Sequence, residues 1–259
     1  DQKKSLGQHW LKDRDILSCI ADEASITSED TVLEIGPGLG TLTSELLRRA
    51  HKVIAVELDE DLARKLPGQF PGTSLEVVHQ DILRFDLRQL PKKYVVVANV
   101  PYYITSKIIR LLTTSSNPPR AIVLLIQKEV AERMVAKPGD MSILAVSSQV
   151  YANVRLGAVV PAELFTPPPK VDSQVVVLEM RSSPLVDSTL EKLFFQAVKA
   201  GFSAKRKKLR SSLSSGLRYS KDEVEEVLAS VGISADARAE DLSIDDWIRV
   251  AHAVKKEGS

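Results

Sequence analysis

The order of apolar segments between residues 16 and 135 is the feature that most constrains the fold of this chain. Short runs rich in β-branched residues alternate there with segments whose apolar residues recur at helical spacing. This alternation is typical of β-α-β units, in which buried parallel strands are covered by helices on both faces. The predicted strands are residues 31–35, 53–57, 75–79, 94–98 and 121–126, and the predicted helices are residues 16–24, 39–49, 60–66, 105–112 and 128–135.

The last two strand-like runs, residues 154–160 and 174–180, have no helix between them, which favours an antiparallel pair at the edge of the sheet.

The sequence changes in character after Met180. Only helical periodicity follows, and Ser220 and Ser243 are predicted N-caps because two acidic residues lie in the first helical turn after each of them. The predicted helices are residues 191–200, 204–213, 222–231 and 244–254. We therefore predict a Rossmann-like α/β domain over residues 1–181 and a small all-α domain over residues 182–259.

Composition excludes several classes of protein. The 35 basic and 34 acidic side chains nearly cancel, so net charge indicates no particular partner. No run of apolar residues is long enough for a transmembrane helix, and the N-terminus lacks the pattern of a signal peptide. The single cysteine excludes a disulfide framework, and the four histidines lack metal-ligand spacing. These features predict a cytoplasmic protein with no metal site.

A glycine-rich segment, Glu-Ile-Gly-Pro-Gly-Leu-Gly over residues 34–40, follows the first predicted strand of the sheet. Gly36 and Gly38 allow a sharp strand-to-helix turn and the close approach of a ligand. Glu57 ends the next strand, where a carboxylate can accept hydrogen bonds from both ribose hydroxyl groups. Asp81 follows the third strand and can accept from an adenine amino group. Together these residues predict a site for a nucleoside-type cofactor.

The spacing of the glycines favours one cofactor without deciding the choice. A dinucleotide fingerprint requires Gly-x-Gly-x-x-Gly or Ala, whereas Thr41 stands at its last position here. S-adenosylmethionine has no pyrophosphate and does not need that helix N-terminus. A nicotinamide-dependent oxidoreductase is the alternative, disfavoured by Thr41 and by the lack of an evident hydride-handling pair.

Asn99-Val100-Pro101-Tyr102 follows the fourth predicted strand. The exocyclic nitrogen of adenine is a poor nucleophile because its lone pair is delocalised into the ring. The Asn99 side chain and a backbone carbonyl near Pro101 can accept its two hydrogens and turn the nitrogen toward a methyl group on a sulfonium. Tyr102 can stack on the base, a contact worth about 1–3 kcal/mol. Positioning then supplies most of the catalysis, although a turn without catalytic function is the alternative interpretation.

Motifs along nearly the whole chain resemble one known family, the rRNA adenine N6-dimethyltransferases of the type that acts on small-subunit rRNA. The motifs are Gly7-Gln8-His9-Trp10-Leu11, the glycine segment, Glu57-Leu58-Asp59, Gln80-Asp81, Asn99-Val100-Pro101-Tyr102-Tyr103, Phe-Thr-Pro-Pro-Pro-Lys-Val-Asp-Ser over residues 165–173, and Gly201-Phe202-Ser203. The resemblance implies an S-adenosylmethionine-dependent enzyme that dimethylates two adjacent adenosines in the 3′-terminal hairpin of 16S rRNA. It also implies a pre-30S ribosomal particle as partner and a role in ribosome biogenesis, and we expect a monomer.

The resemblance also implies roles for single residues. His9 and Leu11 are expected at the cofactor, although the family more often has Asn at position 9. The glycine loop with Gly36 and Gly38, Glu57 and Asp81 would hold the cofactor. Asn99 would face both cofactor and target. Tyr102 would stack on the extruded base, and Phe165 is expected to close its other side.

Nine basic residues and no acidic residue occur between Lys192 and Lys221. Five of them cluster as Lys205, Arg206, Lys207, Lys208 and Arg210. On the predicted helix they would form a positive collar that contacts RNA phosphates, with a solvated helix as the alternative.

Trp247 is predicted to lie in the helical core, and Tyr103 is left between core and stacking roles. Two other functions stay open: a large-subunit rRNA dimethyltransferase of the antibiotic-resistance type, and a non-catalytic nucleic-acid-binding factor.

Overall fold

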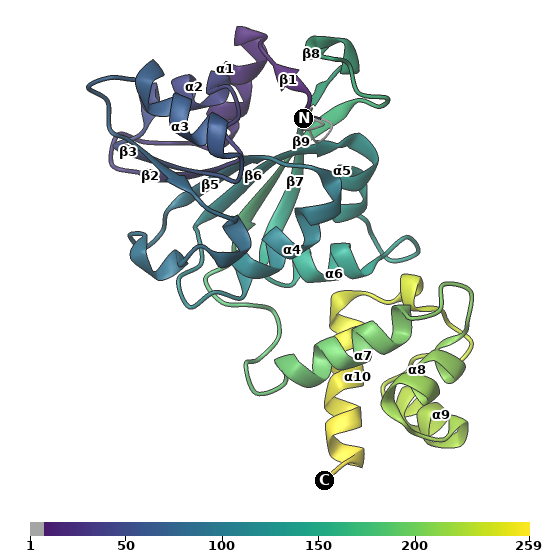
Figure 1. The fold of residues 1–259 in the computed structure, drawn as a ribbon. Helices are drawn as coiled ribbons and strands as arrows, with labels where there is room; N and C mark the ends of the chain where they lie inside the picture. The colour runs from purple at the N-terminus through teal and green to yellow at the C-terminus, as the bar shows by residue number, and fades with distance from the viewer. Residues whose placement is uncertain (1–7) are drawn as a thin grey trace. The chain divides into compact units, whose positions relative to one another are not determined.

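The computed structural model describes residues 8–259, and Gly7 of the first motif lies outside them. Within it the chain divides into two compact units (Figure 1). The first consists of the residues up to 132 and residues 153–180, and the second of residues 133–152 and 181–259. The chain passes from the first unit to the second between residues 180 and 181, one residue before the predicted domain boundary. Residues 133–152 were expected in the first domain but belong to the second unit. None of the described helices combines the length and the hydropathy that crossing a bilayer requires.

The first unit is built on a seven-stranded sheet of order β4-β3-β2-β5-β6-β9-β7. Its strands are β2 Thr31–Ile35, β3 Lys52–Glu57, β4 Leu75–His79, β5 Val95–Asn99, β6 Ala121–Gln127, β7 Ala152–Val160 and β9 Ser173–Met180. The first five strands in this order are parallel, and β9 runs antiparallel to β6. All five predicted parallel strands are confirmed, and the two later strands are neighbours at one edge, as expected. The predicted α/β class is therefore correct.

β2 and β5 lie in the centre of the sheet because their residues are apolar on both faces. All five residues of β2 are buried, as are the first four of β5. On one face, alternate residues such as Val32, Val95 and Val97 join a core cluster with residues of α1 (Arg14–Glu23) and α2 (Thr41–Arg49). Two further helices, α3 (Glu60–Gln69) and α5 (Lys128–Met134), follow β3 and β6.

Several local elements differ from expectation. Helix α4 (Tyr102–Thr113) begins three residues early, because Pro101 at its N-cap has a φ of −59° and needs no hydrogen-bond acceptor for an N–H. Helix α6 (Ile143–Gln149) was not predicted, nor was the two-stranded sheet of β1 (Trp10–Leu11) and β8 (Phe165–Thr166). The two short strands lie far apart in sequence, so no local pattern indicates their pairing.

The second unit packs helices around Trp247, which is fully buried as predicted. They include α7 Glu191–Phe202, α8 Leu209–Leu217, α9 Lys221–Ser230 and α10 Ile244–Glu257. Position 201 requires glycine, because a Cβ there would lie 2.4 Å from the Trp247 ring and would clash with it. Both predicted N-caps are confirmed: Ser220 accepts from the Glu223 N–H at 3.1 Å, and Ser243 accepts from the Asp246 N–H at 3.0 Å.

The predicted helix over residues 204–213 is wrong at its start. Residues 203–208 form a loop between α7 and α8, so the basic run is not a collar on a helix. Four adjacent cations repel one another on a helix, and this stretch offers almost no apolar face to bury. The chain instead turns back, and the N–H groups of Leu209 and Arg210 donate to the carbonyls of Ala237 and Ala235.

Candidate active site

The carboxyl ends of four adjacent parallel strands bring the predicted site residues together. Glu57 and Asn99 end β3 and β5, while Gly36 and Asp81 follow β2 and β4 closely. Because the order is β4-β3-β2-β5, these residues form one row along a single edge of the sheet. Gly36 lies close to the backbone of Asn99, since a Cβ added to Gly36 would be 3.3 Å from the Asn99 carbonyl oxygen.

The glycine turn is covered by the N-terminal strand β1. Gly38 has a φ of +57°, and a Cβ there would lie 2.4 Å from the Trp10 ring. Thr41 Oγ1 donates to the Leu11 carbonyl oxygen at 2.8 Å, which ties β1 to the first residue of α2. Trp10 therefore packs on the turn itself. The Leu11 side chain lies in the core at 4% exposed, and His9 hydrogen-bonds through Nδ1 to the Pro167 carbonyl.

Replacing Gly38 with Ala should destabilise the protein more than the same change at Gly72. Both residues have positive φ, +57° and +72°, so both variants incur about 1–2 kcal/mol of backbone strain. A Cβ at Gly72 meets nothing within 4 Å, whereas at Gly38 it displaces Trp10. Thermal unfolding of the two variants measures the difference. Equal losses of stability would show that the Trp10 contact contributes nothing.

The Glu57 carboxylate is 5% exposed and held by the backbone on both oxygens. Oε1 accepts from the Gly38 N–H at 3.1 Å and Oε2 accepts from the Asp59 N–H at 3.0 Å. Each carboxylate oxygen can accept a second hydrogen bond, so the group is oriented and still able to receive two hydroxyl donors.

Asp81 is half-buried at the start of the segment that follows β4. One of its carboxylate oxygens accepts from the Leu83 N–H at 3.0 Å. Leu58, directly after Glu57, is 64% exposed and Leu83 is 36% exposed. Each leucine closely follows a site carboxylate in the sequence, and neither was predicted to have a role.

Glu34, the first residue of the glycine segment, is a second buried carboxyl group at the site and had no predicted role. It is 2% exposed, and Thr43 of α2 donates a hydrogen bond to its Oε1. Burial raises the pKa of Glu34 to about 8; the Thr43 bond opposes this rise and the charge of Glu57 adds to it. Glu34 is therefore mainly protonated at neutral pH.

The turn after β5 presents two acceptors in different ways. The Pro101 carbonyl oxygen accepts from the Ile104 N–H at 3.3 Å and from Thr105 Oγ1 at 3.2 Å. Its hydrogen-bonding capacity is thus used by the first turn of α4. The Val100 carbonyl precedes that turn and lies outside the hydrogen-bond ladder of the helix. Asn99 is exposed at the end of its strand.

The aromatic candidates differ in exposure, and Phe165 is the one whose burial disagrees with its expected role. Tyr102 is 57% exposed and Tyr103 is 64% exposed, with ring centroids 6.2 Å apart and planes at 82°. Tyr103 is therefore not a core residue. Phe165 is 4% exposed and belongs to the core cluster, opposite Leu11 in the β1–β8 pair. The structure thus presents Tyr102 and Tyr103 at the surface, and not Phe165.

The basic run lies in the second unit and falls into two parts. Lys205, Arg206 and Lys207 are exposed, and no ion pair is formed by them within residues 8–259. Lys208 pairs with Asp236 at 3.0 Å, and Arg210 pairs with Glu225 at 2.8 Å. Three of the five predicted RNA contacts are thus available to an external anion.

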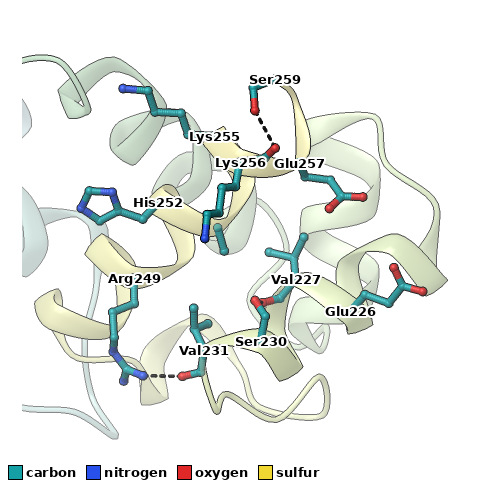
Figure 2. A pocket seen from close by; sticks show the side chains of 11 residues that line it. Glu226, Val227, Ser230, Val231, Arg249, His252, Lys255, Lys256, Glu257 and Ser259 are labelled. Atoms are coloured by element: carbon teal, nitrogen blue, oxygen red, sulfur yellow. Dashed lines mark hydrogen bonds between the residues drawn. The ribbon is translucent and has the colours of Figure 1, made fainter.

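A hollow of about 740 Å³ in the second unit contains none of the predicted site residues (Figure 2). It lies between α9 and α10, where Arg249 donates a hydrogen bond to the Val231 carbonyl and pairs with Asp246. Lys255 and Lys256 occupy the last turn of α10, where cations complement the helix dipole. Arg249 is thus tied to the protein itself, and the two lysines are placed where they stabilise the helix end. Residues 8–259 also contain no group of His, Cys, Asp and Glu arranged to hold a metal.

A Rossmann-like sheet with a glycine turn and a carboxylate at the end of the next strand is typical of enzymes that bind a nucleoside-type cofactor, and the Asn99 turn lies beside this site. The chain belongs to the ribosomal RNA adenine dimethylase family, whose model matches residues 1–256. It is accordingly an S-adenosylmethionine-dependent methyltransferase.

Individual relatives agree with this assignment. The chain is 41% identical to a ribosomal RNA small subunit methyltransferase A of Dehalococcoides mccartyi, over 95% of this chain and 86% of that protein. It is 42% identical to a protein of the same name from Desulfitobacterium hafniense, over 98% and 92%. A dimethyladenosine transferase from Plasmodium falciparum superimposes with a TM-score of 0.82 at 29% identity, over 96% and 98%. The 23S rRNA methyltransferase ErmE superimposes with a TM-score of 0.74 at 29% identity, over 95% and 99%.

Proposed function

We propose that this protein transfers methyl groups from S-adenosylmethionine to N6 of two adjacent adenosines in the 3′-terminal hairpin of 16S rRNA, two to each base. The closeness of Gly36 to the backbone of Asn99 carries the proposal, because it brings the glycine turn beside the residue whose side chain would hold an adenine amine. Relatives about 40% identical bear the name small subunit methyltransferase A, whereas ErmE is 29% identical. No observation favours the large-subunit or the non-catalytic alternative.

The cofactor would be held along the row of strand ends. Glu57 accepts the two ribose hydroxyl groups on the lone pairs left by its backbone donors. Asp81 accepts from the adenine amino group, and Leu58 and Leu83 pack against the flat ring. The absence of a side chain at Gly36 leaves room for the methionine tail. When bound, the cofactor supplies a methyl group on a positively charged sulfur.

The target base would be held by the Asn99 turn. Asn99 Oδ1 and the Val100 carbonyl oxygen accept the two hydrogens of N6, and this leaves the nitrogen lone pair directed at the methyl donor. Val100 replaces Pro101 in this role, because the Pro101 carbonyl already accepts two hydrogen bonds. Tyr102 stacks on the extruded adenine and offsets part of the cost of unstacking it. No general base is needed before the transfer, since positioning lowers the barrier. The methylated nitrogen would take up the positive charge that the sulfur loses, and would then release one proton to water.

The loop with Lys205, Arg206 and Lys207 would contact RNA phosphates, which position the RNA without reading its sequence. Recognition of the shape of the RNA would then select the substrate. As a maturation enzyme of the pre-30S particle, the protein would act as a monomer in the cytoplasm.

Replacing Lys205, Arg206 and Lys207 together with Ala should weaken RNA binding and flatten its salt dependence. Each lost phosphate contact reduces the slope of log K against log salt by roughly 0.7–0.9. The double variant Lys208→Ala/Arg210→Ala is the matched control, and its slope should change less because both side chains are already ion-paired. Filter binding to the rRNA hairpin at several salt concentrations measures the slopes. A triple variant with the wild-type slope would contradict the phosphate contact.

The function itself is tested with labelled S-adenosylmethionine and small ribosomal subunits that lack the modification. Label should appear as dimethyladenosine at two adjacent positions of the 3′-terminal hairpin. Fully modified small subunits and unmodified large subunits serve as controls and should stay unlabelled. Label confined to large-subunit RNA, or no label in any RNA, would refute the proposal.

A further inference from the structure

Glu34 and Thr43 form a side-chain hydrogen bond that spans the glycine turn. Glu34 lies on β2 two residues before Gly36, and Thr43 lies in α2 three residues after Gly40, the N-cap of that helix. Both side chains are buried, at 2% and 0% exposed. The bond therefore joins the strand before the turn to the helix after it, and fixes the distance between them.

The turn is also held from its other side by Glu57, through the bond between Oε1 and the Gly38 N–H. Two carboxyl groups thus support the glycine turn. They interact electrostatically, because the charge of Glu57 raises the pKa of Glu34.

The remaining neighbours of Glu34 do not supply a compensating cation. Its strand partners, Ala55 of β3 and Val97 of β5, are apolar. On α2, Glu45 is paired with Arg49 at 2.9 Å. Glu57 is therefore the charged group that acts on Glu34, and a second negative charge beside it would lack a partner.

We propose that Glu34 is a positioning residue of the cofactor site, which must be a neutral acid bonded to Thr43 so that Glu57 is the single anion presented to the ribose. The inference rests on the proposed ribose contact of Glu57. Both carboxyl groups are already buried, at 2% and 5% exposed, so the cost of ionising Glu34 could be relieved only if the glycine turn moved and admitted water. A bound cofactor holds the turn in place and removes that relief, so ionising Glu34 costs more in the complex. The complex then holds the Glu34 proton more tightly than the free protein does. By linkage, cofactor affinity must fall as pH rises through the titration of Glu34.

Calorimetric titration with S-adenosylhomocysteine across pH 7 to about 9.5 tests this linkage. The demethylated cofactor is the probe because it lacks the sulfonium charge, which would itself favour ionised Glu34. The wild-type Kd should rise roughly five- to tenfold, the change expected if binding raises the pKa of Glu34 by nearly one unit. Glu34→Gln keeps the acceptor for Thr43 and cannot ionise, so its Kd should change less than about twofold. A flat wild-type profile, or a Glu34→Gln profile parallel to it, would overturn the proposal.

A second pair of variants keeps the test decisive if Glu34→Gln does not fold. The Thr43 bond stabilises the ionised form of Glu34, so Thr43→Val should move the midpoint of the profile to higher pH. Thr43→Ser keeps the donor and should leave it in place. An unchanged midpoint in Thr43→Val would count against the proposal. If the proposed ribose contact of Glu57 is itself wrong, the result is different: Glu57→Gln then binds S-adenosylhomocysteine with wild-type affinity at every pH.

Discussion

Replacing Asn99 with Ala should lower kcat for methyl transfer by about a thousandfold, because a preorganised polar group at a reacting centre contributes about 10²–10³ and misplacement of the amine adds to the loss. Affinity for S-adenosylhomocysteine should fall by less than about tenfold, since the removed acceptor contributes one hydrogen bond at most to the cofactor. Single-turnover kinetics on unmodified small subunits and calorimetry measure the two effects separately.

The control for this variant is Asn153→Ala, because Asn153 is an exposed asparagine of β7 in the same unit. It should have wild-type activity and wild-type cofactor affinity. Undiminished turnover in Asn99→Ala would refute the assigned role. An equal loss of cofactor binding and turnover would instead show that Asn99 serves the cofactor alone.

Replacing Glu57 with Gln should weaken cofactor binding by about a hundredfold. The neutral amide cannot form the two charge-assisted hydrogen bonds to ribose, each of which contributes about 1.5–3 kcal/mol with a carboxylate. The new amide group also turns a donor toward the N–H of Gly38 or Asp59, both of which need an acceptor. Calorimetric titration with S-adenosylhomocysteine at neutral pH measures the loss.

Asp61→Asn is the matched control for Glu57→Gln. Asp61 is an exposed carboxylate of α3 that pairs with Arg64 at 3.0 Å, and surface pairs of this kind contribute little. Its variant should bind cofactor as the wild type does. Wild-type affinity in Glu57→Gln would mean that the carboxylate orients the glycine turn without contacting ribose.

Much of the fold could be predicted because the relevant signals are local. A run such as that of β2, buried at all five positions, must be a central strand whatever surrounds it. Parallel order then brings the carboxyl ends of the strands to one edge, so Glu57, Asp81 and Asn99 could be grouped from their positions alone. The same reasoning failed for residues 204–208, where helical propensity competed with repulsion between cations and with hydrogen bonds to residues 235 and 237.

The side-chain environments could not be predicted in the same way. Phe165 is a stacking candidate by type, but its pairing with β1 buries it in the core. The sequence left Tyr103 between a core role and a stacking role, and the structure shows that its ring is exposed like that of Tyr102. Lys208 and Arg210 belong to a basic run, but Asp236 and Glu225 partly neutralise them from 28 and 15 residues away.

The sequence by itself determined the parallel sheet, the glycine turn and the row of polar residues at the strand ends, because burial of apolar strands and backbone freedom at glycine are properties of short segments. Only the tertiary structure decided which of those residues has a partner: Trp10 on Gly38, two hydrogen-bond donors on the Pro101 carbonyl, and Thr43 on Glu34. Trp10 and Gly38 are 28 residues apart and Thr43 and Glu34 are nine apart, and even the donors on Pro101, three and four residues away, depend on distances that the sequence pattern does not record.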